Sequence, residues 1–392
     1  MKKRMYKIMA LVMTAAMVVP MAAQTTAFAA DDKEITYWNI AVESPDKDIV
    51  TAAVDKFNKE TESGYTVNSV AIQNDTYKEK LVIAMSSGEC PDMYSSWSGG
   101  PMYEYIDSGF AQPIDDLLDQ SDIKDKLLDA AIEQGSYNGH VYAIPYLNVS
   151  LAGIFYNKDM FKQYGLEEPK TLADLENICA TLKENGITPF ALANGPKWTG
   201  SMYFMSLAAR YGGLEPFQNA VAGTGKFTDD CFIKAGEKIQ EWVNNGYFPD
   251  GVNSLSEDDG QAKQLMYQET AGMMLGGSFY IGAFQTDSEE FYQKKIGWFP
   301  IPAIDDSDAD PTIQIGTVGD QFISFNCEGD KLAAAFECAT DHLSDEVEDM
   351  IYSTGKIAPV KDAKDHIKDP VVKEIFDAAQ EAPSIQLWYD QY

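Results

Sequence analysis

The chain has 392 residues, of which 61 are acidic and 30 basic, so its formal net charge is −31. A chain this acidic repels nucleic acid and anionic lipid, which argues against both as partners. Its length is sufficient for two lobes of ordinary domain size, each with a core of its own.

A secretory signal peptide is predicted over residues 1–29. Residues 2–7 are rich in Lys and Arg, residues 8–19 are almost unbroken apolar, and Ala27-Phe28-Ala29 supplies the small residues that a signal peptidase reads. The apolar stretch is too short for a permanent membrane span. The first cysteine is Cys90, so the signal junction offers no cysteine for a lipid anchor. We therefore expect an extracytoplasmic protein: secreted, periplasmic or associated with the cell surface.

The first part of the mature chain alternates short apolar runs with helical patterns. Strands are expected at 35–38, 65–72 and 92–96, and helices at 46–61 and 77–88. In the first helix Ile49, Ala53 and Phe57 recur at helical spacing, and Gly88 ends the second.

The middle of the chain continues this alternation. Strands are expected at 141–145, 153–156 and 188–193, and helices at 171–185, 202–210 and 229–245. Thr171 and Asp174 form a capping-box pattern at the start of one helix. Alternation of this kind indicates βαβ units, a largely parallel sheet and hence an α/β protein.

Metal binding and disulfide bonding are both disfavoured by the pattern. The acidic loop at 305–310 resembles a calcium loop, but Pro311 stands in the glycine position and Thr317 in that of the bidentate Glu. A solvated loop without metal is expected. The five cysteines are widely spaced and contain no C-x-x-C pair, which predicts small buried side chains, although the sequence leaves open whether one pair oxidises.

Catalysis finds little support in the motifs. The three histidines, His140, His342 and His366, are scattered, and no nucleophile elbow, HExxH or phosphate-binding glycine loop is present. No catalytic residue and no cofactor are predicted, and we expect a protein that is not an enzyme. A secreted glycoside hydrolase stays as the alternative, because two carboxylates facing a sugar are all that it needs.

Tryptophans in polar loops are the most informative candidates for ligand contact. Trp38, Trp97 and Trp388 stand beside Asn, Ser or Tyr, and Trp198 lies in the loop Asn194-Gly195-Pro196-Lys197-Trp198-Thr199-Gly200, several of them at expected strand ends. Ligands of open α/β sheets bind beyond the carboxyl ends of the strands, and the apolar face of a pyranose ring stacks on indole. Trp242 and Trp298 lie in apolar patterns, so packing in the core is expected for them instead.

Two motifs resemble bacterial extracellular solute-binding proteins of the maltose-binding type, the family 1 receptors of carbohydrate ABC importers. The first runs from Tyr142-Ala143-Ile144-Pro145-Tyr146 through Phe155-Tyr156-Asn157-Lys158-Asp159 to Pro169-Lys170-Thr171. The second is Ala271-Gly272-Met273-Met274-Leu275-Gly276-Gly277-Ser278-Phe279. The likeness extends over essentially the whole mature chain.

The resemblance implies a two-lobed fold of the periplasmic-binding-protein type II class, with a hinge between the lobes. By analogy the N-terminal lobe comprises 30–130 plus 316–342 and the C-terminal lobe 131–315 plus 343–392. The hinge crossings are expected near 118–131, 314–318 and 342–347. Relatives usually continue past the Trp388 equivalent, so the C-terminal lobe is expected to be incomplete at Tyr392 and to expose apolar surface.

The resemblance also implies a monomeric receptor that captures a sugar or oligosaccharide and delivers it to the permease subunits of an ABC importer. The candidate ligand-binding residues are Trp97, Trp198, Trp388, Trp38, Asn39, Glu43, Asp75, Phe279, Tyr280 and Asp320. Phe279 stands where the family usually presents a tryptophan, which suggests a different sugar. A receptor for a peptide or a polyamine is the other alternative, and a polyamine site would need carboxylates between the aromatics.

Overall fold

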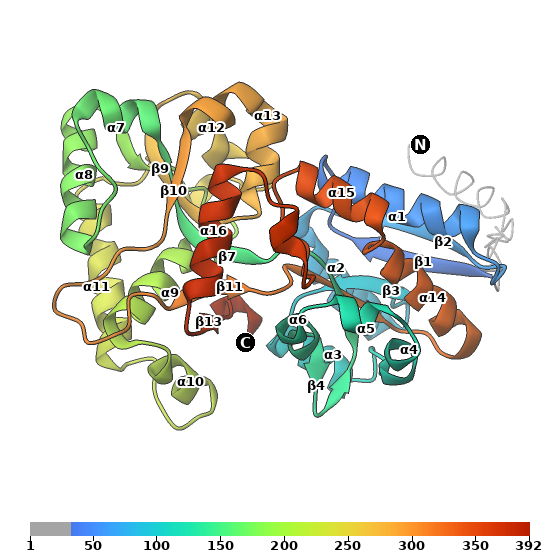
Figure 1. Ribbon diagram of the computed structural model, residues 1–392. Coiled ribbons are helices and arrows are strands. Elements are labelled where there is room, and N and C mark those ends of the chain that lie inside the picture. Colours follow the sequence, from blue (N-terminus) through green and yellow to red (C-terminus); the bar gives the residue numbers. More distant parts are fainter. Residues whose placement is uncertain (1–32) are drawn as a thin grey trace, which may run out of the picture. The chain divides into compact units, whose positions relative to one another are not determined.

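The computed structural model describes residues 33–392, so the predicted signal peptide lies outside the described residues. Within this part of the chain no helix is both long and apolar enough to cross a membrane. Two β-sheets with helices packed around them make up its architecture (Figure 1).

The first sheet has the strand order β2-β1-β3-β12-β6. Its strands are β1 (Glu34–Asn39), β2 (Thr66–Ala71), β3 (Met93–Ser96), β6 (Ala143–Leu147) and β12 (Gln321–Phe325). β1 pairs in parallel with β2 and β3, whereas β12 is antiparallel to β3 and β6. The parallel strands are joined by α1 (Asp46–Glu60) and α2 (Asn74–Ser87), as βαβ units require.

The second sheet has the order β13-β11-β7-β9-β8, and β10 also pairs with β7. Its strands are β7 (Ser150–Asn157), β8 (Thr188–Phe190), β9 (Ala271–Gly277), β10 (Ile296–Phe299), β11 (Gln314–Thr317) and β13 (Ile385–Gln386). A separate hairpin joins β4 (Ser136–Tyr137) and β5 (His140–Val141). The predicted strand at 141–145 is therefore two strands, since Val141 belongs to this hairpin.

The remaining helices follow the predicted alternation, with additional short ones. They are α3 (Gly100–Asp107), α4 (Asp115–Asp119), α5 (Ile123–Lys126), α6 (Asp129–Gln134), α7 (Lys158–Tyr164), α8 (Leu172–Glu184), α9 (Trp198–Gly212), α10 (Glu215–Val221), α11 (Asp230–Asn244), α12 (Gln261–Tyr267), α13 (Tyr280–Lys295), α14 (Gly329–Asp341), α15 (Asp345–Ser353) and α16 (Pro370–Glu381). Single turns of 3₁₀ helix are η1 (Val252–Ser254), η2 (Ala363–Asp365) and η3 (Tyr389–Gln391). The capping box of Thr171 and Asp174 is confirmed at the start of α8, and Gly88 ends α2 with φ of 78°.

The expectation of a largely parallel sheet is wrong, because both sheets are mixed. β7 runs antiparallel to β9, β10 and β11. β7 follows β6 of the first sheet after only Asn148 and Val149, so its direction is set by the passage between sheets and not by a βα crossover. The sequence pattern identifies strands but does not say from which side each one enters its sheet.

The chain passes between the sheets at neighbouring positions. β6 leads to β7 through Asn148-Val149, and β11 leads back to β12 through 318–320. The backbone N–H of Asp320 donates to the carbonyls of Leu147 and Asn148, each at 2.8 Å. The predicted lobe boundary at 130/131 lies before β6, which belongs to the first sheet. The lobe boundaries themselves stay a prediction.

Two tryptophans expected in the core are buried there. Trp298 lies against Gly153, where any Cβ would come within 2.2 Å of the indole. Trp242 donates its Nε1–H to Glu176 at 3.1 Å and stacks on Phe190. Both packing predictions are confirmed.

Cysteines and the acidic loop take ordinary structural roles. All five cysteines are free thiols in the structure, and four of them are buried, which agrees with their interpretation as small buried side chains. In the loop at 305–310, Asp310 accepts hydrogen bonds from the backbone and hydroxyl of Thr312. Residues 33–392 contain no group of three or more His, Cys, Asp or Glu placed to hold a metal ion.

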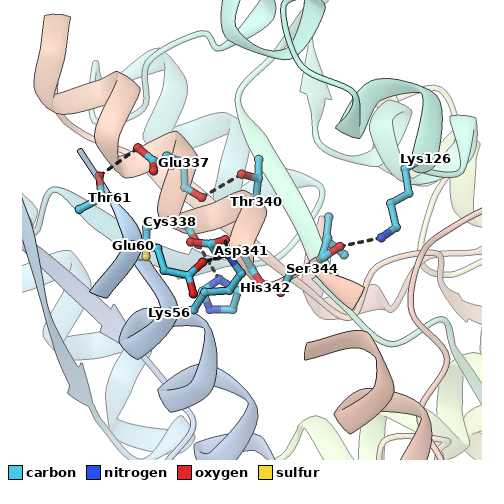
Figure 2. Close-up of polar contacts among 11 residues, drawn as sticks. Lys56, Glu60, Thr61, Lys126, Glu337, Cys338, Thr340, Asp341, His342 and Ser344 are labelled. Carbon is cyan, nitrogen blue, oxygen red and sulfur yellow. Dashed lines mark hydrogen bonds and ion pairs between the residues drawn. The ribbon is translucent and has the colours of Figure 1, made fainter. Parts of the chain in front are cut away.

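The end of α14 is tied to α1 by polar contacts around a buried histidine (Figure 2). Lys56 of α1 lies 2.8 Å from Glu60 and 3.0 Å from Asp341, so one ammonium bridges both helices. His342 is completely buried, and its Nδ1 lies 3.1 Å from the carbonyl of Cys338. Burial lowers the pKa of His342 to about 4, because it disfavours the charged imidazolium. His342 is therefore a neutral part of the core.

Candidate ligand-binding site

A cavity of about 280 Å³ is lined by residues that follow strands of both sheets, by helix residues and by the C-terminal segment. Six of the predicted site residues line it: Trp97, Trp198, Phe279, Tyr280, Asp320 and Trp388. A second cavity of about 180 Å³ is lined by Glu43 and shares Asp46, Asn74 and Phe279 with the first. Seven of the ten predicted residues thus line one or other of two adjoining cavities.

Trp97 follows β3 and is held by its neighbours. Its ring meets Tyr77 edge to face at 5.9 Å, and the ammonium of Lys78 lies 4.7 Å from its centroid. Gly99 has φ of 93°, and the carbonyl oxygen of Gln391 lies 1.8 Å from where its Cβ would be. Only glycine fits there, so the turn after Trp97 brings the C-terminal segment against the cavity wall.

Trp198 stands at the start of α9 on a turn that its neighbours shape. The hydroxyl of Thr199 donates to the carbonyl of Ala193 at 2.6 Å, and the N–H of Gly200 donates to Asn194 Oδ1 at 3.0 Å. The indole Nε1–H donates to Asp75 Oδ1 at 3.4 Å. This long bond connects α9 to the first turn of α2 at the rim of the cavity.

Phe279, Tyr280 and Trp388 complete the aromatic lining. Ser278 follows β9, and its hydroxyl lies 3.3 Å from both the carbonyl of Val149 and the N–H of Leu151. This anchor places Phe279 and Tyr280 at the start of α13, with the Phe279 ring 6.0 Å from that of Trp198. Trp388 precedes η3 and is only 4% exposed, because it also packs into the core of the second sheet.

Carboxylates line the same cavity as these aromatic rings. Asp46 pairs with Lys356, and Asp390 lies 3.3 Å from Lys78. Burial raises the pKa of Asp320 to about 7, although the positive charge of Lys356 lowers it.

Glu257 and Asp258 are two further carboxylates of the lining whose pKa is raised. Glu257 is 8% exposed, and burial raises its pKa to about 8 although Tyr280 and Lys263 lower it. Asp258 Oδ2 accepts the backbone N–H of Asp75 at 3.0 Å. Burial, with the charge of Asp75 adding to it, raises the pKa of Asp258 as well.

Three predicted residues do not line either cavity. Trp38 packs with Trp97 against the small apolar cluster around Tyr77. Asn39 is buried and shapes the turn after β1, where its Oδ1 accepts from Ala41 N–H at 3.0 Å and its Nδ2 donates to Ser69. Asp75 lies at the rim, through its contacts with Trp198 and Asp258.

Sequence reasoning missed most of the polar lining. The missed polar residues include Asp46, Asn74, Glu257, Asp258, Lys263 and Asp390. The run Glu257-Asp258-Asp259 carries no pattern that separates it from the other acidic residues of the chain. The packing of α12 and α13 beside it, and not the local sequence, decides that Glu257 is buried.

A two-sheet α/β protein whose chain passes repeatedly between the sheets, with a cavity lined from both, has the architecture of a solute-binding protein. The family model described as bacterial extracellular solute-binding protein matches residues 41–340. The chain belongs to this family, as its motifs predicted. The family consists of extracytoplasmic binding proteins and not of enzymes, in agreement with the predicted export.

Curated relatives match at moderate identity. An uncharacterized ABC transporter extracellular-binding protein of Pyrococcus horikoshii is 31% identical over 229 residues, which cover 58% of this chain and 50% of the relative. A multiple sugar-binding protein of Streptococcus mutans is 30% identical over 46% of this chain and 38% of its own length. The alignments span about half the length of the curated relatives.

Solved structures match over nearly the whole chain. A protein studied for xylan utilization by the thermophilic bacterium Caldanaerobius polysaccharolyticus superposes with a TM-score of 0.83 at 29% identity, covering 92% of this chain and 91% of that one. A chitin oligosaccharide binding protein superposes with a TM-score of 0.82 at 21% identity, over 91% and 89% of the two chains. The predicted α/β fold of the periplasmic-binding-protein type is confirmed.

Proposed function

We propose that this protein is an extracytoplasmic receptor that captures a sugar or oligosaccharide and delivers it to an ABC importer. The observation that supports this proposal most strongly is that Trp97, Trp198 and Trp388 all line one cavity. These residues are separated by about a hundred positions or more along the chain, and each follows or precedes a different strand or helix.

The chemistry of the lining suits a saccharide. Indole and phenyl rings offer flat apolar surfaces to the faces of pyranose rings, and fixed carboxylates and amides offer acceptors and donors to the hydroxyls. Asn74, Asp320 and Gln321 lie in the lining with the aromatics. The relatives named for sugars, among them the multiple sugar-binding protein and a maltotriose-binding protein of Pyrococcus abyssi, support this class of ligand.

Hinged closure would complete the binding event. We propose two lobes centred on the two sheets, joined at 148–149 and 318–320 and by the returning segment after α15. A saccharide held first by one lobe and then by both stabilises the closed form by its differential affinity. The closed receptor, acting as a monomer, would then meet the permease subunits without itself transforming the sugar.

A thermal-unfolding screen of the exported chain against neutral mono- and oligosaccharides tests the proposal. A ligand present at 100 times its dissociation constant adds about 2.7 kcal/mol of stability, which is a shift of several degrees at most in a protein of this size. We expect a clear shift with one saccharide class. Chromatography of the same mixtures after long incubation should show unchanged saccharide, whereas cleavage products would support the glycoside hydrolase alternative.

A second panel separates the remaining alternatives. Spermidine and short peptides are tested at the same concentrations as the saccharides. A shift with spermidine or a peptide, and none with any saccharide, would refute the carbohydrate assignment and favour the corresponding receptor.

A further inference from the structure

The charges around the cavity are not evenly compensated. Asp46 is paired with Lys356, and Asp390 with Lys78. Three other carboxylates, Glu257, Asp258 and Asp75, lie close together, and we call them the Glu257 corner. Asp258 and Asp75 are held together by the backbone hydrogen bond from Asp75 N–H to Asp258 Oδ2, and not by a cation.

Lys263 lines the cavity and is the cation that acts on Glu257. Its charge lowers the pKa of Glu257. Its ammonium also lies 3.3 Å from the carboxylate of Asp287, a residue of α13 that does not line the cavity. Even with Glu257 protonated, Asp75 and Asp258 together carry more negative charge than this one shared lysine offsets.

Glu257 distinguishes this corner from an ordinary acidic surface. The side chain is more than nine-tenths buried and forms part of the cavity wall. Its Oε2 has no hydrogen-bond partner among the described residues. A buried carboxyl oxygen without a partner costs free energy unless a bound molecule supplies a donor. The Glu257 corner therefore lacks a hydrogen-bond partner for Glu257 Oε2. A bound hydrogen-bond donor would supply it, and a cationic donor would also offset the negative charge.

We propose that the cavity selects saccharides by charge, favouring a protonated amino group at the Glu257 corner and rejecting a carboxylate there. This inference rests on the proposed carbohydrate-binding function and assigns its ligand class. An ammonium substituent donates up to three hydrogen bonds and neutralises the excess charge, whereas a uronic acid would add a further anion beside Glu257 and Asp258.

Aromatic rings near the corner fit the same ligand. Trp198 donates to Asp75, and Tyr280 contacts Glu257, so the aromatic surfaces border the carboxylates directly. A cation over an aromatic face gains further attraction when it is shielded from water. An amino sugar whose ring stacks on Trp198 would place its ammonium beside the carboxylates of the Glu257 corner.

Matched ligands test the charge selection. For every saccharide scaffold that binds in the neutral screen, the counterpart with an amino group and the counterpart with a uronic acid are titrated by calorimetry, below the pKa of the amine. We expect at least one amino counterpart to bind about tenfold tighter than its neutral parent, and the uronic acids to bind about tenfold more weakly. The preference should decrease with added salt, because ions screen the corner.

Variants of the corner assign the effect to its residues. Glu257→Gln keeps the shape and removes the carboxyl that could ionise beside a bound ammonium, and Asp258→Asn removes the neighbouring carboxylate. Each should weaken binding of the amino ligand more than binding of its neutral parent, so that the ratio of the two affinities falls. Glu289→Gln is the matched control, because it removes an exposed carboxylate of α13 outside the cavity.

The outcomes separate this inference from the proposed function. Neutral parents that bind as tightly as all their amino counterparts would overturn the charge selection and leave the carbohydrate receptor standing. The same holds if both corner variants keep the preference, or if Glu289→Gln loses it equally. If no saccharide of any charge binds, the proposed function fails and this inference fails with it.

Discussion

The Glu257 corner and the end of α14 around His342 both bury an ionisable side chain, and the two differ in what surrounds it. His342 is enclosed by Tyr146 and Tyr37, with its Nδ1 beside a backbone carbonyl. Glu257 stands in a cavity wall beside two further acidic residues. Burial neutralises both groups at neutral pH. A closed, packed environment indicates a structural role, whereas a buried acid at a cavity indicates a site that a ligand completes.

The largest expected effect is the response of stability to Glu257→Gln. The folded-state pKa of Glu257 is raised from 4.5 to about 8, so the folded protein holds this proton more tightly than the unfolded chain. As pH rises from 4.5 to about 8, Glu257 therefore lowers the free energy of unfolding by a growing amount, and above this range the amount stays constant. Replacing it should stabilise the protein at pH 8 by a few kcal/mol and have little effect at pH 4.5.

Urea unfolding across this range measures the difference, with Glu289→Gln as the control. A stability gain independent of pH would contradict the burial of an ionisable Glu257, and a loss at high pH would mean that its charge is compensated.

His342 should show the opposite dependence. Its folded-state pKa is lowered from 6.5 to about 4, so between these pH values the unfolded chain binds a proton at this histidine that the folded protein does not bind. Stability should fall by about 1–3 kcal/mol as pH drops through this window. His342→Gln should lose some stability at neutral pH by poorer packing, and its unfolding free energy should depend less on pH between 4 and 6.5. An unchanged acid dependence would place the titrating group elsewhere.

Ligand affinity should respond to the cavity wall and not to the core. Trp198→Ala removes the indole between Asp75 and Phe279 and should cost about 1–3 kcal/mol of binding free energy for the saccharide found by screening. Trp242→Phe is the matched change in a packed tryptophan that lines neither described cavity. It should lower stability and leave affinity unchanged. Equal affinity for wild type and Trp198→Ala would remove Trp198 from the site.

The smallest expected effect lies at the polar contacts beside His342. Lys56 bridges Glu60 and Asp341, but its side chain is 28% exposed, so solvent screens these ion pairs. Lys56→Met should cost at most about 1 kcal/mol, and less at high salt. A much larger loss in thermal unfolding would mean that the ties in Figure 2, and not the burial of His342, hold α14 to α1.

Sequence reasoning was strongest where a local signal exists. The helix from Asp46 and the Thr171–Asp174 capping box rest on patterns within a few residues, and the structure has both. Of the four tryptophans expected to contact ligand, three line the cavity, whereas Trp38 lies in β1 and does not. Asn39 shows the limit: a polar residue at a strand end forms a structural turn as readily as it contacts a ligand.

Structural features that depend on contacts between distant segments of the chain could not be predicted from the sequence. The antiparallel direction of β7 depends on the passage from β6 between two sheets. The burial of Glu257 depends on α13 and on the loop after β9, which place Tyr280 against it. Neither dependence leaves a periodicity or motif in the chain, so only the assembled structure reveals them.

A crystal structure of the exported protein with the saccharide that gives the largest thermal shift tests the central claim most directly. The account predicts a sugar ring stacked on at least one of Trp97, Trp198 and Trp388, with its polar groups reaching the carboxylates of the cavity. A saccharide bound at another surface, with this cavity empty of ligand, would contradict it.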